Sequence, residues 1–307
     1  MKLVSLVVPV YNEEEMLPIF FKKIEELFHD DDNYHYEFLL INDGSKDKTL
    51  DIIKEEAQKN DRLSYISFSR NYSQECAVEA GLRSAKGDVV IPLDCDFQDP
   101  PEVVFDMLKK YEEGYEVVNA KRINRKKVPF LKRITAELFY YVIGKLTGKI
   151  KVPNNVGNYR LMSRKVVDLV NELTEKNRVF RIQVPYVGFK TTDIEFVRPA
   201  RAKGTTHYNY GAMIKLAGDS ITSSSITPLR WSLIFGCVGG FISFILCLIF
   251  LILHYTSRLS SIWFVISFIS LWGSILLLAI GIVGEYVGRS LLEDQNRPIY
   301  YIEEEIK

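Results

Sequence analysis

Short apolar runs and amphipathic stretches alternate along residues 1–120 of the chain. Runs such as 4–10 and 89–93 are rich in β-branched and aliphatic side chains, as in strands that are buried on both faces. The segment 15–28 instead repeats its apolar positions with the period of one helix face. We predict strands at 4–10, 38–41, 63–68, 89–93 and 117–120, and helices at 15–28, 47–58, 74–84 and 100–114. This alternation predicts an α/β fold built on a doubly wound, mostly parallel sheet.

Two segments near the C-terminus, 231–253 and 262–283, contain no charged residue. Each is about 22 residues long, which is enough for a helix to cross a hydrocarbon core of about 30 Å. The connection between them is short, so the two helices form a hairpin whose flanks share one side of the membrane. We therefore predict a two-helix transmembrane hairpin at 229–285.

Basic residues are distributed unevenly around this predicted hairpin. Arg230, Arg289 and Arg297 lie on its flanks, against Arg258 in the tight loop. Because positively charged flanks face the cytoplasm, we expect a multi-pass protein of the plasma membrane whose large N-terminal domain is cytoplasmic.

The remaining segments complete the predicted domain organisation. The cytoplasmic domain covers 1–207 and includes a stretch, 129–147, in which basic residues flank bulky apolar ones. Such a helix can lie in the membrane interface, and a helix packed on the sheet is an equally good interpretation. We expect an amphipathic linker helix at 208–228 and a cytoplasmic tail at 286–307.

Composition excludes several classes of partner and site. Lys and Arg together number 39, as do Asp and Glu, so net charge gives no reason to expect a nucleic acid as partner. The cysteines are scattered, without a Cys-x-x-Cys motif, so neither a zinc site nor a disulfide framework is indicated. They are Cys76, Cys95, Cys237 and Cys247.

Asp94 and Asp96 directly follow the apolar run at 89–93. In open α/β sheets, ligands bind just beyond the carboxyl ends of the strands. Two carboxylates so close together repel each other unless a cation lies between them. Oxygen ligands suit Mg²⁺ or Mn²⁺, which commonly bridge to substrate phosphates. The pair therefore predicts a divalent-metal site.

Other polar residues are expected at the same edge of the sheet. The segment 9–13 follows the first predicted strand, Asp43 follows the second, and Lys121 and Arg122 end the fifth. An aromatic ring, an acid, a metal pair and cations together describe a site for a nucleotide diphosphate. The chain lacks the Gly-x-Gly-x-x-Gly of a dinucleotide fold and the Gly-Lys-Ser/Thr of an ATPase loop.

With these motifs in place, the chain resembles family 2 glycosyltransferases with the A-type fold. The matching segments are VVPVYNEE at 7–14, NDGS at 42–45, DCDFQDPPE at 94–102, GNYRL at 157–161, NR at 177–178, VGF at 187–189, RAKGTT at 201–206, DSITS at 219–223 and GEYVGR at 284–289. Within the family, the chain is similar to the polyprenyl-phosphate branch. That branch includes dolichyl-phosphate mannose synthases and bacterial polyprenyl-phosphate glucosyltransferases with a C-terminal membrane hairpin.

The resemblance implies a metal-dependent inverting glycosyltransferase that uses Mg²⁺ or Mn²⁺. Its donor would be a nucleotide diphosphate sugar, UDP-glucose or UDP-N-acetylglucosamine, and its acceptor polyprenyl (undecaprenyl) phosphate. The product would be a lipid-linked sugar donor for modification of cell-envelope glycans.

The resemblance also implies roles for particular residues. Asp94, Asp96 and Gln98 would hold the metal on the donor diphosphate. Arg122 and Arg133 would bind the acceptor phosphate, and Arg201 the donor phosphates. The nucleotide sugar would further contact Pro9, Tyr11, Asn12, Glu13 and Asp43.

The chain departs from the family pattern at Asn42 and Asn158. Family members often have an acid at the position of Asn42. The bacterial glucosyl branch commonly has an acid, regarded as a catalytic base, at the position of Asn158. A base is superfluous here, because a phosphate monoester has a second pKa of about 6 and is already an oxyanion at pH 7.

Two other functions are compatible with the same motifs. A processive polysaccharide synthase shares the fold, but it normally carries Gln-x-x-Arg-Trp, and Thr227 occupies the position of that Gln before Arg230 and Trp231. The other possible function is a membrane-anchored scaffold that binds sugar nucleotides without catalysis.

We also expect a homo-oligomer, because small residues in both predicted spans permit close helix packing, although they can equally pack the hairpin on itself. They are Gly236, Gly239, Gly240, Gly281, Gly284 and Gly288.

Overall fold

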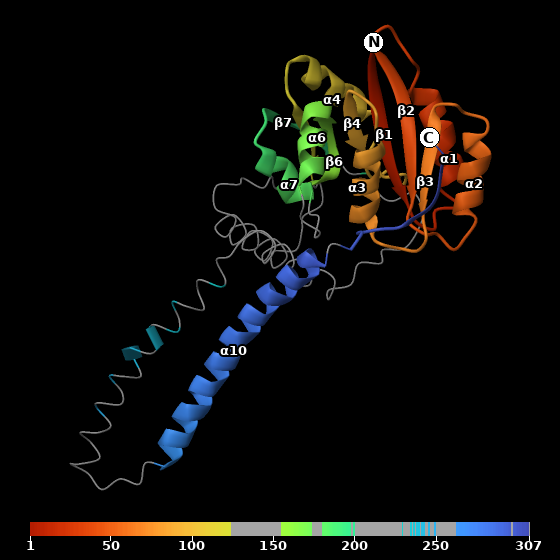
Figure 1. The fold of residues 1–307 in the computed structure, drawn as a ribbon. Helices are drawn as coiled ribbons and strands as arrows, with labels where there is room; N and C mark the ends of the chain where they lie inside the picture. The colour runs from red at the N-terminus through yellow and green to blue at the C-terminus, as the bar shows by residue number, and fades with distance from the viewer. Residues whose placement is uncertain are drawn as a thin grey trace. The chain divides into compact units, whose positions relative to one another are not determined.

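The structure, a computed structural model, describes residues 1–123, 155–173, 180–197, 199, 262–295 and 297–306, with isolated positions between 229 and 249. The chain divides into two compact units. The first comprises Met1–Tyr210 together with Pro298–Lys307, and the second comprises Gly211–Arg297. Figure 1 shows the elements of each unit.

The first unit is built on one sheet whose strand order is β7-β5-β6-β4-β1-β2-β3-β8. Neighbouring strands run parallel except where β6 or β8 takes part. The strands are β1 (Lys2–Val10), β2 (Tyr34–Asn42), β3 (Leu63–Phe68), β4 (Val89–Pro92), β5 (Val117–Ile123), β6 (Val156–Ser163), β7 (Thr191–Val197) and β8 (Ile302–Ile306). The predicted α/β sheet is thus confirmed, and it is mixed rather than uniformly parallel.

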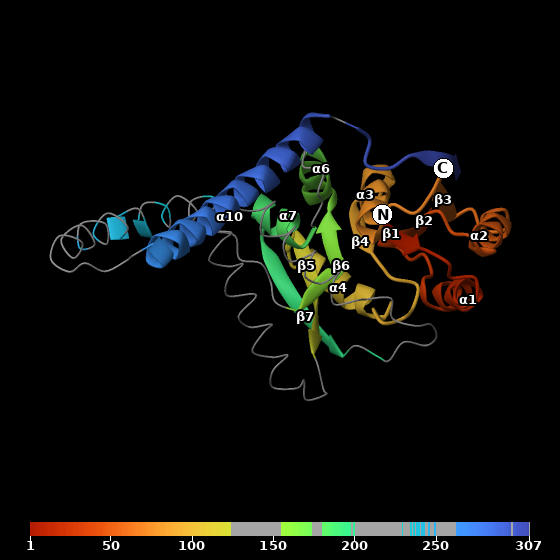
Figure 2. The ribbon, with the colours of Figure 1, turned by 90° about the horizontal axis from the view of Figure 1, so that it is seen from below.

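Helices cover both faces of this sheet. They are α1 (Leu17–Leu27), α2 (Thr49–Ala57), α3 (Gln74–Ser84), α4 (Val103–Glu112), α6 (Arg164–Glu172) and α7 (Phe180–Val187). Figure 2 shows α3 and α6 on one side of the sheet and α1 and α4 on the other. The layers follow from strand alternation, because Phe38 and Leu40 of β2 pack in one buried apolar cluster and Leu39 and Ile41 pack in the other.

The strand order reverses direction at β1. From β1 the chain proceeds through β2 to β3 on one side, and then returns to place β4 on the other side of β1. α1 and α3, which follow β1 and β3, therefore lie on opposite faces of the sheet, and α/β proteins bind ligands outside the carboxyl edge at such a switch point. The segments that follow β1 and β4 contain Tyr11 and the pair Asp94 and Asp96.

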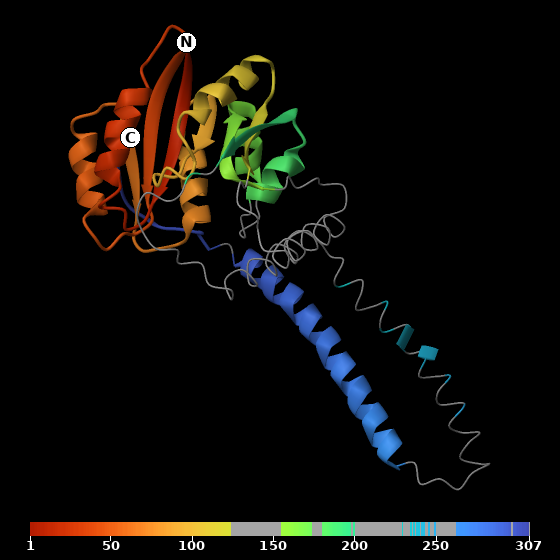
Figure 3. The ribbon, with the colours of Figure 1, turned by 180° about the vertical axis from the view of Figure 1, so that it is seen from behind.

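The last strand was not predicted from the sequence. β8 pairs antiparallel with β3, so the residues after the second unit return to the edge of the first unit's sheet. Both chain ends lie in this unit, as Figure 3 shows. The predicted tail at 286–307 thus contains a strand of the sheet.

The second unit contains α10, a helix of 33 residues at Ile262–Asp294. The second predicted span, 262–283, lies within this helix. Across the described part of the chain, no helix meets the length and hydropathy needed for a membrane span. The predicted hairpin therefore stays a prediction. The segments 129–147 and 208–228, and most of 231–253, lie outside the described residues.

Candidate active site

The loops that follow β1 and β2 are joined by hydrogen bonds. Asn12, in the left-handed region at φ 53°, donates its backbone N–H to Ser45 Oγ at 2.9 Å and accepts from the backbone N–H of Lys46 at 2.8 Å. Glu13 donates its backbone N–H to Thr49 Oγ1 at 2.8 Å. Tyr11 remains 42% exposed. These bonds fix the backbone at the carboxyl end of β1, where the Tyr11 ring is accessible to a ligand.

Asp43 lies at the end of β2 and organises the loop that follows β3. Its Oδ1 accepts the backbone N–H of Tyr72 at 2.6 Å, and its Oδ2 accepts that of Ser73 at 3.0 Å. Burial raises the pKa of this carboxyl, and the two amide donors oppose the rise. Direct contact between Asp43 and a nucleoside stays a prediction, whereas the carboxylate's hold on the loop is observed.

Asp94 and Asp96 sit at the carboxyl end of β4, as predicted. Asp94 Oδ1 accepts a hydrogen bond from Gln74 Nε2 at 2.8 Å, and Asp96 Oδ1 accepts the backbone N–H of Gln98 at 3.0 Å. The thiol of Cys95, buried between them, has a pKa well above its usual value, first because of burial and then because of nearby negative charges. Those charges are Glu13, Asp94 and Asp96. Three carboxylates therefore create a negative potential at this edge.

This donor set fits a divalent cation that is shared with a ligand. Two carboxylates one residue apart provide hard oxygen donors, and diphosphate oxygens and water complete such a coordination sphere. Gln98 follows in the same loop and is partly exposed. Within the described residues, no group of three or more His, Cys, Asp or Glu is arranged to hold a metal by protein ligands alone.

Arg122 reaches the same edge from β5. Its Nη2 donates to both oxygens of Asp99, at 3.1 and 3.3 Å, and Asp99 is 2% exposed. Gly157 lies against this guanidinium, because a Cβ at that position would be 2.9 Å from Arg122 Nη2. The sequence predicted that Arg122 lies here but not that Asp99 is its partner.

A buried polar cluster surrounds Asn158 on β6. Its Nδ2 donates to Glu75 Oε1 at 3.1 Å. Burial raises the pKa of Glu75, and the bond from Asn158 opposes that rise. The neighbouring Arg160 is 1% exposed, and burial lowers its pKa to about 10. At this position the chain therefore has an amide that donates to a carboxylate from α3.

The structure brings most of the predicted site residues to one edge. Arg133 and Arg201 lie outside the described residues. Sequence reasoning missed Gln74, Glu75 and Asp99, because a pattern of residues gives no signal for a partner that only tertiary packing supplies.

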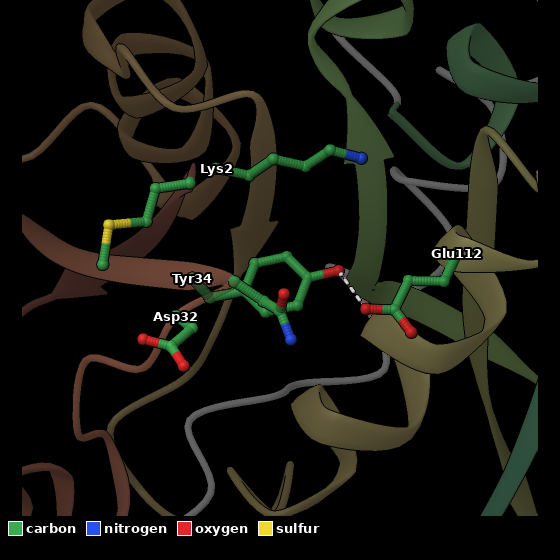
Figure 4. A pocket seen from close by; sticks show the side chains of 6 residues that line it. Lys2, Asp32, Tyr34 and Glu112 are labelled. Carbon is green, nitrogen blue, oxygen red and sulfur yellow. Dashed lines mark hydrogen bonds between the residues drawn. The ribbon is translucent and has the colours of Figure 1, made fainter.

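A cavity of about 270 Å³ lies at the opposite edge of the sheet. Lys2, Asp32 and Tyr34 line it at the beginnings of β1 and β2, and Tyr34 donates its hydroxyl hydrogen to Glu112 at 3.0 Å (Figure 4). Because β1 and β2 are parallel, their beginnings lie a full strand length from the acid pair. The cavity is therefore separate from the candidate active site.

The fold and the acids at its carboxyl edge are those of an α/β protein that binds a ligand at that edge. The model of the glycosyl transferase family 2 matches residues 5–170, and the chain belongs to that family.

Two relatives align along nearly their whole length. A prophage bactoprenol glucosyl transferase homolog of Escherichia coli (strain K12) is 41% identical over 97% of this chain and 98% of its own. A bactoprenol glucosyl transferase of Shigella phage SfV is 41% identical over 98% of each chain. Among solved structures, glucosyl-3-phosphoglycerate synthase from Mycobacterium tuberculosis has a TM-score of 0.48 and 18% identity over 73% of this chain and 79% of its own. At this TM-score nothing further about the chain follows from the structural likeness.

The pair formed by Glu75 and Asn158 generates a prediction about stability and pH. Asn158→Asp removes the amide donor and sets two carboxylates against each other, so the pKa of both rises. Groups with a raised folded-state pKa contribute stability below about pH 4, and this contribution is lost as the pH rises. We expect the variant to lose about 1–3 kcal/mol at pH 8 and clearly less at pH 5, measured by chemical unfolding of the full chain in detergent.

The matched control exchanges the amide and the carboxylate between positions 75 and 158. Glu75→Gln combined with Asn158→Asp restores one donor and one acceptor, and it should recover most of the stability at pH 8. Equal losses for Asn158→Asp at both pH values would contradict the carboxylate explanation.

Proposed function

We propose that this family 2 glycosyltransferase transfers a sugar from a UDP-sugar, UDP-glucose or UDP-N-acetylglucosamine, to polyprenyl phosphate, with undecaprenyl phosphate as the bacterial acceptor. The proposal rests on the presence of both acidic and basic side chains at the carboxyl edge of the sheet. Asp94 and Asp96 suit a cation on a diphosphate, and Arg122 offers a guanidinium that is bonded to Asp99 of the loop that follows them. The bactoprenol glucosyl transferases, 41% identical along the whole chain, support glucose as the sugar and a polyprenyl phosphate as the acceptor.

In the proposed reaction the acceptor supplies its own nucleophile. Its phosphate is largely a dianion at pH 7, and one oxygen forms a bond to C1 of the sugar. The bond from C1 to the β-phosphate of UDP breaks in line with that attack, so the configuration at C1 inverts and UDP leaves. Asp94, Asp96 and Gln98 would hold the Mg²⁺ or Mn²⁺, which when bound offsets the charge that develops on the leaving diphosphate.

The remaining residues bind and orient the two substrates. Tyr11 and Glu13 line the donor side, with Pro9 near the end of β1 and Asn12 in the loop that follows, and Arg201 is assigned to the donor phosphates. Arg122 and Arg133 are assigned to the acceptor phosphate. No base is needed, which agrees with the amide found at Asn158. Positioning and charge neutralisation then provide most of the catalysis.

We also propose that the chain is a plasma-membrane protein anchored by the hairpin at 229–285, with the catalytic domain cytoplasmic. Support comes from the uncharged segments of the sequence and from large apolar side chains that α10 exposes. These include Val265, Ile269, Leu276, Leu277, Leu278, Ile280, Val283, Val287 and Leu291. Gly239 packs against Trp272 within this unit, where a Cβ would be 2.0 Å from the indole ring. The homo-oligomer stays a prediction.

The first test of the function is Asp96→Asn. The change keeps the shape of the side chain but removes its charge, so we expect transfer to fall at least about a hundredfold with no change in melting temperature. Purified chain, Mn²⁺ and radiolabelled UDP-glucose or UDP-N-acetylglucosamine are incubated with undecaprenyl phosphate, and the label in the lipid extract is counted.

Asp32→Asn is the matched control, because it makes the same chemical change at the opposite edge of the sheet. It should leave transfer unaltered. Near-normal transfer by Asp96→Asn, together with insensitivity to EDTA, would show that no metal acts at this pair.

The second test concerns Arg122. A guanidinium binds a phosphate through two parallel hydrogen bonds that an ammonium cannot copy. We expect Arg122→Lys to raise the KM for undecaprenyl phosphate about tenfold and to leave the KM for the UDP-sugar nearly unchanged.

Asp99→Asn separates this role from a purely structural one. It removes the charge that competes with a phosphate for Arg122, so the KM for undecaprenyl phosphate should stay equal or fall. If both variants instead lower the melting temperature and leave both KM values unaltered, the pair serves only the fold.

The third test concerns membrane topology. With a membrane-impermeant maleimide, intact cells should label an introduced Ser260→Cys in the predicted external loop. They should not label Asp61→Cys, which lies on the surface of the first unit, until the cells are permeabilised. The unaltered chain measures the background from its own cysteines. Labelling of Asp61→Cys in intact cells would reverse the proposed orientation.

A further inference from the structure

The residues that follow α10 contact the loop between β3 and α3. The backbone N–H of Ser69 donates to the carbonyl oxygen of Tyr301 at 3.1 Å. The ring of Tyr300 stacks on Phe68 with centroids 4.8 Å apart and an interplanar angle of 19°. The ring of Tyr301 lies 6.5 Å from that of Tyr72. Residues 298–306, here called the returning tail, therefore hold the beginning of this loop by main chain and by aromatic rings.

The pairing of β8 with β3 fixes the returning tail in register. Ser67 is opposite Glu304, and the register shifts between Ser67 and Phe68, where Phe68 is opposite Ile302. Lys54 of α2 forms an ion pair with Glu304 at 2.5 Å, which raises the pKa of Lys54. Both side chains of that pair are partly exposed, so it contributes little to stability. The ring stacking and the strand pairing are the main attachments.

The same loop supports the donor side of the active site at its other end. Asp43 accepts the backbone N–H groups of Tyr72 and Ser73. Gln74, the next residue, donates to Asp94 of the acid pair at 2.8 Å. A continuous series of contacts thus leads from the returning tail, through five loop residues, to Asp43 and Asp94.

The loop is held in a conformation that it would not keep without support. The backbone of Ser73 has φ 106°, a value that residues other than glycine rarely adopt. Gly44 allows the loop to approach β2, because a Cβ there would be 2.3 Å from the carbonyl carbon of Arg70. Strained backbone persists only where the surroundings determine it. Here the surroundings are Asp43 on one side and the returning tail on the other.

We propose that the returning tail is a positioning element for the nucleoside diphosphate half of the active site, with Tyr300 as its main contact. By holding residues 69–73, it keeps Asp43 and Gln74 in the arrangement that receives the donor. Without it the loop is disordered before the donor binds, and binding must order it at a cost in affinity. The inference rests on the proposed function, because it concerns the donor side of the same site.

The test compares the full chain with variants of the returning tail in detergent, using UDP with Mn²⁺ as the probe in calorimetry. A chain that ends at Arg297 and the point variant Tyr300→Ala should both bind UDP about tenfold more weakly. Their KM for the UDP-sugar should rise similarly, whereas the KM for undecaprenyl phosphate should not change. Tyr300→Phe retains the ring that stacks on Phe68 and should bind UDP like the unaltered chain.

Glu303→Gln is the matched control within β8, because Glu303 is exposed and lies at the register shift. It should leave UDP binding unaltered. A double-mutant cycle adds a measurement that a purely structural role would not affect. Because the tail and Asp43 hold the same loop, Tyr300→Ala and Asp43→Asn together should weaken UDP binding by less than the sum of their separate effects.

The outcomes separate this inference from the proposed function. An unaltered chain that neither binds UDP nor transfers sugar contradicts the function and the inference together. An unaltered chain that transfers sugar, with variants that melt at a lower temperature but bind UDP normally, overturns the inference alone. In that case β8 only covers the edge of β3, as strands rich in charge often do.

Discussion

The parallel pairing of β1 with both β2 and β4 is the constraint on which the site depends. Each strand in a parallel sheet ends at the same edge, so residues that are far apart in sequence are brought together there without any direct attraction between them. Glu13, Asp43 and the pair Asp94 and Asp96 are separated by up to 83 positions in sequence, from 13 to 96, and all follow one of these three strands. The attraction that maintains the arrangement is burial of the apolar faces of the strands, not chemistry at the site.

That burial lets the carboxyl edge tolerate unfavourable electrostatics. Burial raises the pKa of the Cys95 thiol, and the negative charges of Glu13, Asp94 and Asp96 raise it further. The fold offsets part of this locally, through Gln74 on Asp94 and a backbone amide on Asp96. Arg122 and Asp99 likewise neutralise each other, through an ion pair of 3.1 Å.

The sequence predicted the elements whose pattern has a clear period. β1 to β5 and α1 to α4 were expected from strand alternation and from helical spacing, and all are present. β8 could not be predicted in this way, because three consecutive glutamates in its sequence IEEEI interrupt the alternation of apolar and polar residues. Its structure comes from the edge of β3, which supplies the hydrogen-bonding partners, and from Tyr300, which supplies the apolar contact.

The same distinction applies within the site. The acid pair was predictable because the sequence itself shows both the apolar strand and the two aspartates that directly follow it. The partner of Arg122 was not, since Asp99 meets it only when β5 passes the loop after β4. Asp43 was expected to face a ligand, yet both of its oxygens accept backbone amides of another loop. A motif residue therefore identifies the place of a site more securely than it identifies the contact that the residue makes there.

Asn158 shows how this reasoning bears on mechanism. An acid at that position would face Glu75 in a buried setting, and the two would share a proton rather than act as a strong base. The amide instead donates to Glu75, near the buried guanidinium of Arg160. This arrangement agrees with the proposed reaction, in which the site generates no nucleophile because the phosphate acceptor is already ionised.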